Sequence, residues 1–197
     1  MLIKNEADKA QYKNIWVTAE LSAGHIQPVT YELIGAARLL ADSRASEVWV
    51  LLLEPEAANN PDSLFAAGAD TVIQVNDPAL AEFHDEAEAN VLVRLIDKYK
   101  PEIIITGATT RGRALIPRVA VLAECGLTAD CTELAIDPEN GDLLQTRPAF
   151  GGNIMATIRC SSHRPQLATV RPRVMKAPEQ DPARHGRVIT ERLEPLD

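Results

Sequence analysis

The feature that most constrains this chain is a repeated change in the spacing of its apolar residues. Short continuous apolar runs, typical of strands buried on both faces, alternate with segments whose apolar residues recur at helical spacing. Such alternation is typical of a parallel sheet covered by helices. The sequence therefore predicts an α/β fold, a three-layer α/β/α sandwich around a mostly parallel sheet.

The expected elements follow one another along the first two thirds of the chain. Strands are predicted at 15–19, 48–53, 71–75 and 103–106, and helices at 29–40, 61–68, 82–99 and 111–123. After Gly126 the pattern changes, because strand-like runs follow one another with turn signals between them instead of helices. These runs are 128–136, 143–147, 153–160 and 167–170. We expect them to form a β-rich extension.

The length of 197 residues suits one large domain. We place that domain at residues 1–175 and a tail at residues 176–197. The tail contains Pro178, Pro182 and Pro195 among charged residues, a composition typical of linkers. It is predicted to be a linker or docking arm that leads toward a further domain.

Charge and hydropathy exclude several classes of protein. The 20 basic and 28 acidic residues give a net charge of −8, which disfavours a nucleic-acid partner because phosphate binding needs a basic face. The apolar runs are far shorter than the ~20 residues of a membrane helix. The first twelve residues have no apolar signal-peptide core. We expect a cytoplasmic protein, or a mitochondrial matrix protein if a transit peptide was removed.

Cysteine and histidine spacing indicates neither a metal site nor a catalytic site. Three cysteines, Cys125, Cys131 and Cys160, show no C-x-x-C spacing and are predicted to be buried thiols. The four histidines are scattered without a metal-binding pattern. No Ser-His-Asp, Cys-His or paired-carboxylate arrangement is present. We therefore predict no metal ligand, no catalytic residue and no enzymatic activity of the chain itself.

The first candidate binding loop is residues 107–113, between a predicted strand and a predicted helix. Ligands of doubly wound sheets bind at such positions. Its glycines have the G-x-x-x-x-G spacing of a P-loop, but Arg113 and Ala114 replace the required Lys and Ser or Thr, which excludes a P-loop. Alternatively, Thr109 and Thr110 only cap the helix and the arginines are solvated. The candidate cofactor-binding residues are Gly107, Thr109 and Arg111.

The second candidate loop is residues 147–153, between two predicted strands. Paired glycines allow a sharp turn or a close approach of another molecule. The arginine and the aromatic ring could bind a flat cofactor or a partner's carboxylate. In the other interpretation the loop is a long hairpin with its ring in its own core. The candidate residues are Arg147, Phe150, Gly151, Gly152 and Asn153.

Residues 14–175 resemble the amino-terminal domain of the electron transfer flavoprotein alpha subunit. The most specific segments are GLTADCT, QTRPAFGGN and ATVRP, which occur in this order between residues 126 and 172. One residue departs from the family pattern: Ala114 stands after GATTRGR, where an acidic residue is common. The resemblance implies an adenine-nucleotide-hydrolase-like sandwich fold.

The resemblance also implies a function, a partner and cofactors. The chain would pack on a beta subunit in a heterodimer that passes electrons from flavin dehydrogenases to a downstream acceptor. FAD would be bound by a carboxy-terminal domain of the complete alpha subunit, and AMP or a second FAD by the beta subunit. No cofactor is expected on residues 1–197 alone. The eight candidate residues of the two loops would face the cleft shared with the partner.

Two other interpretations remain open at this point. A nucleotide-binding module of the universal-stress or ATP-pyrophosphatase kind would share the fold. It would need a glycine-rich phosphate loop after the first strand, and residues 18–24 do not supply one. A purely structural interaction domain would differ only in making no contact with a cofactor. The sequence does not specify the dehydrogenase, the acceptor or whether electrons are bifurcated.

Overall fold

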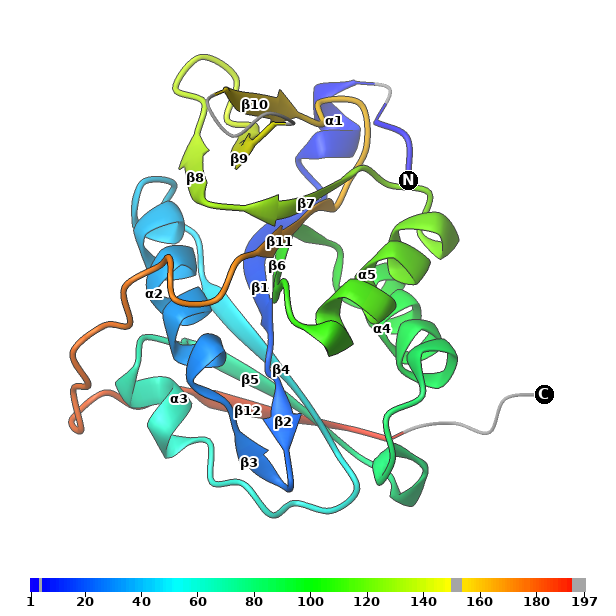
Figure 1. Ribbon diagram of the computed structural model, residues 1–197, viewed down its shortest axis with the longest axis vertical. Coiled ribbons are helices and arrows are strands. Elements are labelled where there is room, and N and C mark those ends of the chain that lie inside the picture. Colours follow the sequence, from blue (N-terminus) through cyan, green and yellow to red (C-terminus); the bar gives the residue numbers. More distant parts are fainter. Residues whose placement is uncertain (4, 150–153, 193–197) are drawn as a thin grey trace.

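The computed structural model describes residues 1–3, 5–149 and 154–192. At its centre is a seven-stranded sheet in which every neighbouring pair is parallel, in the order β12-β5-β4-β1-β6-β11-β7 (Figure 1). The strands of this sheet are β1 (Lys13–Thr18), β4 (Val48–Glu54), β5 (Thr71–Asn76), β6 (Pro101–Gly107), β7 (Leu127–Cys131), β11 (Gln166–Val170) and β12 (Arg187–Glu191).

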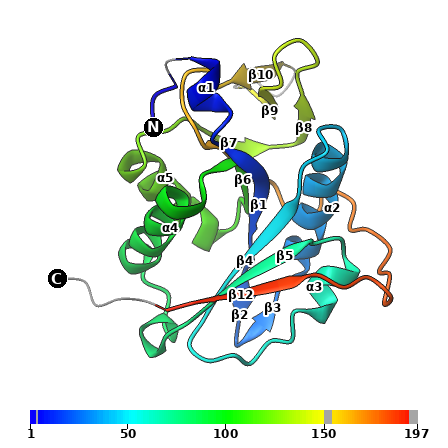
Figure 2. The ribbon, with the colours of Figure 1, turned by 180° about the vertical axis from the view of Figure 1, so that it is seen from behind.

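Helices cover both faces of this sheet, as Figures 1 and 2 show from opposite sides. On one face lie α2 (Pro28–Asp42) and α3 (Asp62–Ala66), and on the other α4 (Asp85–Tyr99) and α5 (Thr110–Leu122). A short α1 (Glu6–Lys9) precedes β1, and a 3-10 helix η1 (Pro78–Leu80) follows β5. The predicted three-layer α/β/α sandwich is confirmed.

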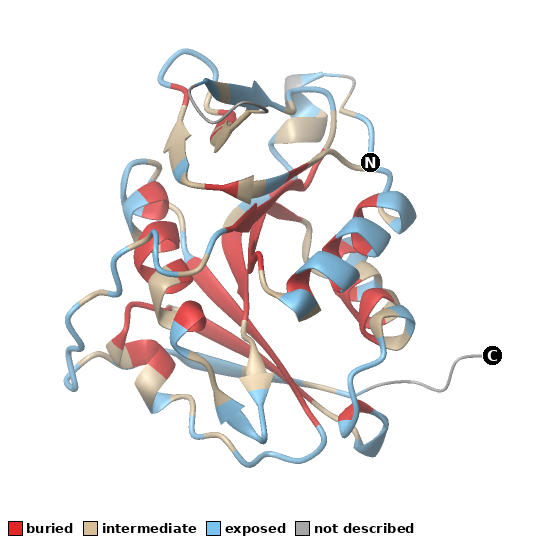
Figure 3. Ribbon diagram, in the orientation of Figure 1, coloured by how far each residue is buried: buried red, intermediate tan, exposed pale blue. Residues whose placement is uncertain are grey.

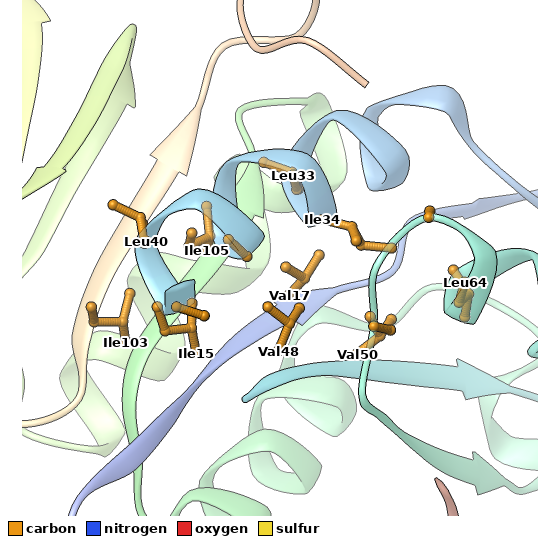
Figure 4. Packing of buried hydrophobic residues seen from close by; sticks show 14 of the residues in the cluster. Ile15, Val17, Leu33, Ile34, Leu40, Val48, Val50, Leu64, Ile103 and Ile105 are labelled. Carbon is orange, nitrogen blue, oxygen red and sulfur yellow. The ribbon is translucent and has the colours of Figure 1, made fainter. Parts of the chain in front are cut away.

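Side chains of the central strands alternate between the two faces, as the pleat of a strand requires. Val17 of β1 packs with Leu33 of α2 in one apolar core, which Figure 4 shows. Trp16 and Ile104 face the second core, under α4 and α5. Figure 3 shows the central strands buried along most of their length, which explains why their sequences are continuous apolar runs.

The predicted β-rich extension contributes to two sheets. A three-stranded antiparallel sheet contains β8 (Glu133–Ile136), β9 (Leu143–Pro148) and β10 (Met155–Arg159), in the order β10-β9-β8. β7 and β11 instead extend the main sheet. The expected single strand at 128–136 is wrong, because the chain bends at Thr132 and β7 and β8 join different sheets. After β1 the chain forms a short antiparallel hairpin, whose strands β2 (Leu21–Ser22) and β3 (His25–Ile26) have two residues each.

Part of the predicted linker is a strand of the main sheet. Residues 187–191 form β12, which pairs in parallel with β5 along its whole length. The interpretation of residues 176–197 as a linker is therefore wrong for this part, although the division of the chain at residue 175 stays a prediction. β12 is an edge strand with mostly exposed or half-buried side chains, so its sequence carries no continuous apolar signal.

The segment that leads to β12 crosses the outer side of α2. A Cβ atom at Gly35, in the middle of α2, would lie 2.6 Å from the carbonyl oxygen of Lys176 and 3.0 Å from the Pro178 ring. Glycine in a helix interior costs about 1 kcal/mol relative to alanine. Close approach of the 176–178 backbone explains why glycine occupies this position.

Gly35→Ala tests whether this contact outweighs helix propensity. We expect the substitution to lower the free energy of unfolding by about 1–3 kcal/mol, as overpacking does, although alanine is the better helix former. Leu39→Ala on the same helix is the control, because Leu39 is exposed and should change stability by no more than about 0.5 kcal/mol. Urea unfolding measures both, and a Gly35→Ala chain more stable than wild type would contradict the close contact.

Candidate functional site

The carboxyl ends of β1 and β6 meet at the point where the chain changes direction across the sheet. From β1 the chain moves outward to β4 and β5, and it then crosses back to β6 on the other side of β1. Ligands of doubly wound sheets bind in the crevice at this topological switch point. Here the hydroxyl groups of Thr18 and Thr106 join the two strands through a hydrogen bond of 2.7 Å. The general rule for this fold therefore predicts a ligand position in this crevice.

The loop between β6 and α5 forms one wall of the crevice. Thr109 is the N-cap of α5: its Oγ1 accepts from the backbone N–H of Gly112 at 3.1 Å and donates to Glu20 Oε2 at 2.7 Å. Thr109 is thus a helix cap, as in the second of the two interpretations of this loop. A contact between Thr109 and a cofactor stays a prediction.

The spacing of the two glycines in this loop has a packing explanation. A Cβ atom at position 112 would lie 1.9 Å from the carbonyl oxygen of Gly107, so no residue larger than glycine fits. The first turn of α5 can therefore lie directly against the end of β6. The G-x-x-x-x-G spacing serves this close helix-to-strand contact.

Arg111 enters the crevice from the first turn of α5. Its guanidinium forms an ion pair with Glu88 of α4 and a hydrogen bond of 3.4 Å to the carbonyl of Leu21. The ring of Phe83 lies over the guanidinium at 4.6 Å, a distance at which cation–π attraction operates. Arg111 therefore joins α5, α4 and the segment after β1 at the crevice.

The remaining space in the crevice is small. Arg111 and Glu88, together with Thr18, Thr106 and neighbouring leucines, line a cavity of about 20 Å³, which is room for about one water molecule. A nucleotide or flavin ring does not fit among these side chains. The Arg111–Glu88 pair occupies the space that a ligand uses in open folds of this class.

Glu88 is a buried carboxylate, with 2 % of its surface exposed. Burial raises the pKa of Glu88 above its ordinary value of 4.5, and the charge and hydrogen bond of Arg111 only partly oppose this effect. Sequence reasoning missed Glu88, which lies among apolar residues of a predicted helix. The signal that could have found it is a carboxylate on the apolar face of that helix.

A second polar group lies at the other side of the α5 start, and we call it the Asp130 cluster: Asp130, Arg113, Arg147 and Arg171. Arg171 donates to Asp130 through Nη2 at 2.6 Å and Nε at 3.3 Å, and Arg113 lies 3.3 Å from the same carboxylate. The hydrogen bond from Arg171 lowers the pKa of Asp130, and the charges of Arg113 and Arg147 act in the same direction.

The structure separates the predicted site residues into three sets. Gly107, Thr109 and Arg111 lie together at the crevice, whereas Arg147, on β9, belongs to the Asp130 cluster. The other four, Phe150, Gly151, Gly152 and Asn153, lie outside the described residues. Asp130 and Arg171 were not singled out from the sequence, although they occur in the GLTADCT and ATVRP segments.

Neither thiols nor carboxylates form a metal site in the described part of the chain. Within residues 1–3, 5–149 and 154–192, no group of three or more His, Cys, Asp or Glu side chains could hold a metal ion. The cysteines are free; Cys131 is buried, as expected, whereas Cys125 and Cys160 are half-buried. Burial raises the pKa of Cys125 and of Cys131 to about 11, so both thiols stay protonated near neutral pH.

No helix among the described residues is both long enough and apolar enough to cross a bilayer.

Comparisons with known proteins agree with the geometry of the fold. Residues 15–196 match the family model of the electron transfer flavoprotein domain. The chain is 49% identical to the electron transfer flavoprotein subunit alpha of Thermoanaerobacterium thermosaccharolyticum, over 90% of this chain and 54% of that protein. It is 45% identical to Protein FixB of Azorhizobium caulinodans, over 92% of this chain and 50% of that protein.

A further relative has a name of another kind. The chain is 48% identical to the LctC subunit of the lactate dehydrogenase (NAD(+),ferredoxin) of Acetobacterium woodii, over 88% of this chain and 41% of that protein. The chain thus spans about half the length of the curated relatives it matches.

Glu88→Gln tests the buried ion pair through its pH dependence. Because the folded protein holds the Glu88 proton more tightly than the unfolded chain, the contribution of this carboxyl group to the free energy of unfolding falls as the pH rises above 4.5. We expect wild type to lose stability relative to Glu88→Gln between pH 4.5 and neutral pH, measured by urea unfolding at several pH values.

The control for this experiment is Glu86→Gln, on an exposed residue of the same helix. Its stability should follow wild type across the pH range. A difference between wild type and Glu88→Gln that is constant with pH would contradict the effect of burial on Glu88.

Proposed function

The chain belongs to the electron transfer flavoprotein domain family, and we propose that it acts as the amino-terminal domain of an alpha subunit. The complete protein would pass electrons from flavin dehydrogenases to a downstream acceptor, in a heterodimer with a beta subunit. The observation that carries this proposal is the family match over residues 15–196, supported by 49% identity to a protein named subunit alpha. The dehydrogenase and the acceptor are left open.

Within this protein the domain would provide binding surfaces and no catalytic residue. The filled crevice supports this role, because a space of about 20 Å³ beside Arg111 and Glu88 leaves no room for a substrate. The same observation counts against the alternative of a stand-alone nucleotide-binding module, which needs an open crevice and a phosphate loop.

FAD would be bound by other parts of the complete protein. When bound, it supplies the electron transfer, since flavin chemistry is a property of the cofactor. The described residues at the switch point do not fit a flavin, for the reason of space given above. Contacts of Gly107, Thr109, Arg111 and Arg147 with a cofactor of the partner would therefore be made from the rim of a shared cleft.

The three-stranded sheet is the surface we assign to the beta subunit. β10 is the edge strand of that sheet, and Ile154, Met155 and Ile158 on or next to it are exposed. Exposed apolar side chains on a sheet edge are typical of a strand that another chain covers. Arg147 pairs with Ala156 across β9 and β10, so it lies beside this edge. The predicted loop residues Phe150, Gly151, Gly152 and Asn153 would extend the same surface.

The purified chain is expected to hold no stoichiometric flavin, because its switch-point crevice is filled. Visible absorbance of the protein after gel filtration with excess FAD measures this directly. One equivalent of retained flavin per chain would contradict the assignment of the cofactor to other parts of the complete protein.

Met155→Asp tests the partner surface. Met155 is 54% exposed, so a charge there should leave folding intact, but burying that charge against a partner without a counter-charge is costly. We expect the affinity for an electron transfer flavoprotein beta subunit to fall at least about tenfold, as measured by calorimetry.

The control is Leu39→Asp, at an exposed position of α2, a helix that is not part of the three-stranded sheet. It should bind like wild type. Equal affinities for all three chains would contradict docking through β10, and no binding by wild type would contradict the proposed function itself.

A further inference from the structure

The Asp130 cluster brings together side chains from separate elements of the fold. Arg113 comes from the first turn of α5, Arg147 from β9, and Arg171 directly follows β11. All of them act on one carboxylate, that of Asp130 at the end of β7. These four residues come from separate parts of the sequence. Together they place positive charge at the carboxyl edge of the main sheet, next to the three-stranded sheet.

The backbone at Asp130 adopts a left-handed conformation. Asp130 has a φ of +64°, in the left-handed region that non-glycine residues rarely adopt. The pairing of β7 with β11 shifts register at this point, as in a β-bulge. The hydroxyl of buried Thr169 accepts the Asp130 N–H at 2.9 Å and supports the conformation.

The charges in this cluster do not cancel. Two guanidinium groups, those of Arg113 and Arg171, contact the one carboxylate of Asp130, and the charge of Arg147 also acts on it, so positive charges outnumber the negative one on a chain whose net charge is −8. Arg113 uses Nε to bind the carbonyl of Ala108 at 2.9 Å and Nη2 to contact Asp130. Among the described residues, no acceptor binds the Nη1 of Arg113 or the guanidinium of Arg147. Donors remain for a second anion.

We propose that the Asp130 cluster docks a carboxylate of the partner protein, with Arg113 and Arg171 as its main donors. This inference rests on the proposed function, because the partner is the beta subunit that covers the neighbouring β10 edge. Asp130 neutralises only part of this positive charge before the partner binds. Arginine forks bind carboxylates with two parallel hydrogen bonds and so add orientation as well as attraction.

The exposure of the arginines favours a protein carboxylate over a nucleotide phosphate. The side chains of Arg113 and Arg171 are 60% and 45% exposed, whereas small ligands bind in concave sites that cover most of their surface. A second copy of this chain is disfavoured, because two chains of charge −8 repel each other. Surplus positive charge at the edge of an interface raises the association rate and makes it depend on salt.

The test compares three arginine variants in binding to the beta subunit. Arg113→Gln and Arg171→Gln are each expected to weaken binding about tenfold at low salt and to reduce its salt dependence. The matched control is Arg118→Gln: Arg118 also lies on α5, is 43% exposed and pairs with Asp85 at 3.0 Å. It should bind like wild type. Melting temperatures check that each variant is folded. If Arg171→Gln does not fold, the test rests on Arg113→Gln, because Arg113 is the more exposed residue.

Asp130→Asn separates docking from a structural role. Asparagine tolerates a positive φ, and its neutral side chain leaves the three positive charges uncompensated. Docking of a carboxylate predicts binding at low salt at least as tight as wild type. A structural role of the ion pairs predicts that Asp130→Asn weakens binding as Arg171→Gln does, and that result would overturn the proposal.

Three further outcomes are decisive. If wild type binds the beta subunit and the Arg113→Gln, Arg171→Gln and Arg118→Gln variants bind equally well, the docking role is refuted while the proposed function stands. If titration with inorganic pyrophosphate shows binding that Arg113→Gln abolishes, while beta-subunit affinity is unchanged, the ligand is a phosphate and the proposal is wrong. If wild type does not bind the beta subunit at all, the proposed function and the docking role fail together.

Discussion

A fully buried guanidinium, that of Arg164, joins the three-stranded sheet to the main sheet. Its Nη2 donates to Asp142 Oδ1 at 2.6 Å, and Asp142 also pairs with Lys9 of α1 at 3.2 Å. Removing one partner of a buried pair costs about 3–5 kcal/mol, because a buried charge is left uncompensated. A different packing of the segments that carry these three residues would break these pairs. The position of β9 and β10, and with it the proposed partner surface, depends on that packing.

Sequence periodicity predicts the centre of the fold well because that part is buried on both faces. A short apolar run such as 48–53 favours a strand buried on both faces because it is too short for a typical helix, and the glycine and proline signals around such runs mark the ends of the helices. β12 could not be predicted in this way, since an edge strand with exposed side chains resembles a charged linker. The division between β7 and β8 lies at a bend at Thr132, which no residue pattern reveals.

For the candidate site, the sequence predicted where the loop lies but not what its residues do. The sequence located the loop after β6 at the carboxyl edge of the sheet, and the structure places it there. The sequence did not show that Arg111 turns inward to Glu88. These two residues lie on different helices and 23 positions apart, so their ion pair leaves no local pattern in the sequence. The role of the glycine at 112 was equally hidden, since its neighbour is the carbonyl of Gly107 and not a phosphate.

Two arginines of the same helix turn illustrate how burial determines what a charge can do. Arg111 is largely enclosed and must be neutralised by Glu88, because an unpaired charge there would be costly. Arg113, two residues later, is exposed and shares its carboxylate with other arginines, since water tolerates a surplus of charge. Closing the crevice with the first arginine removes the usual ligand position of the fold. The charge available for recognition is therefore on the outer surface, where only another molecule can neutralise it.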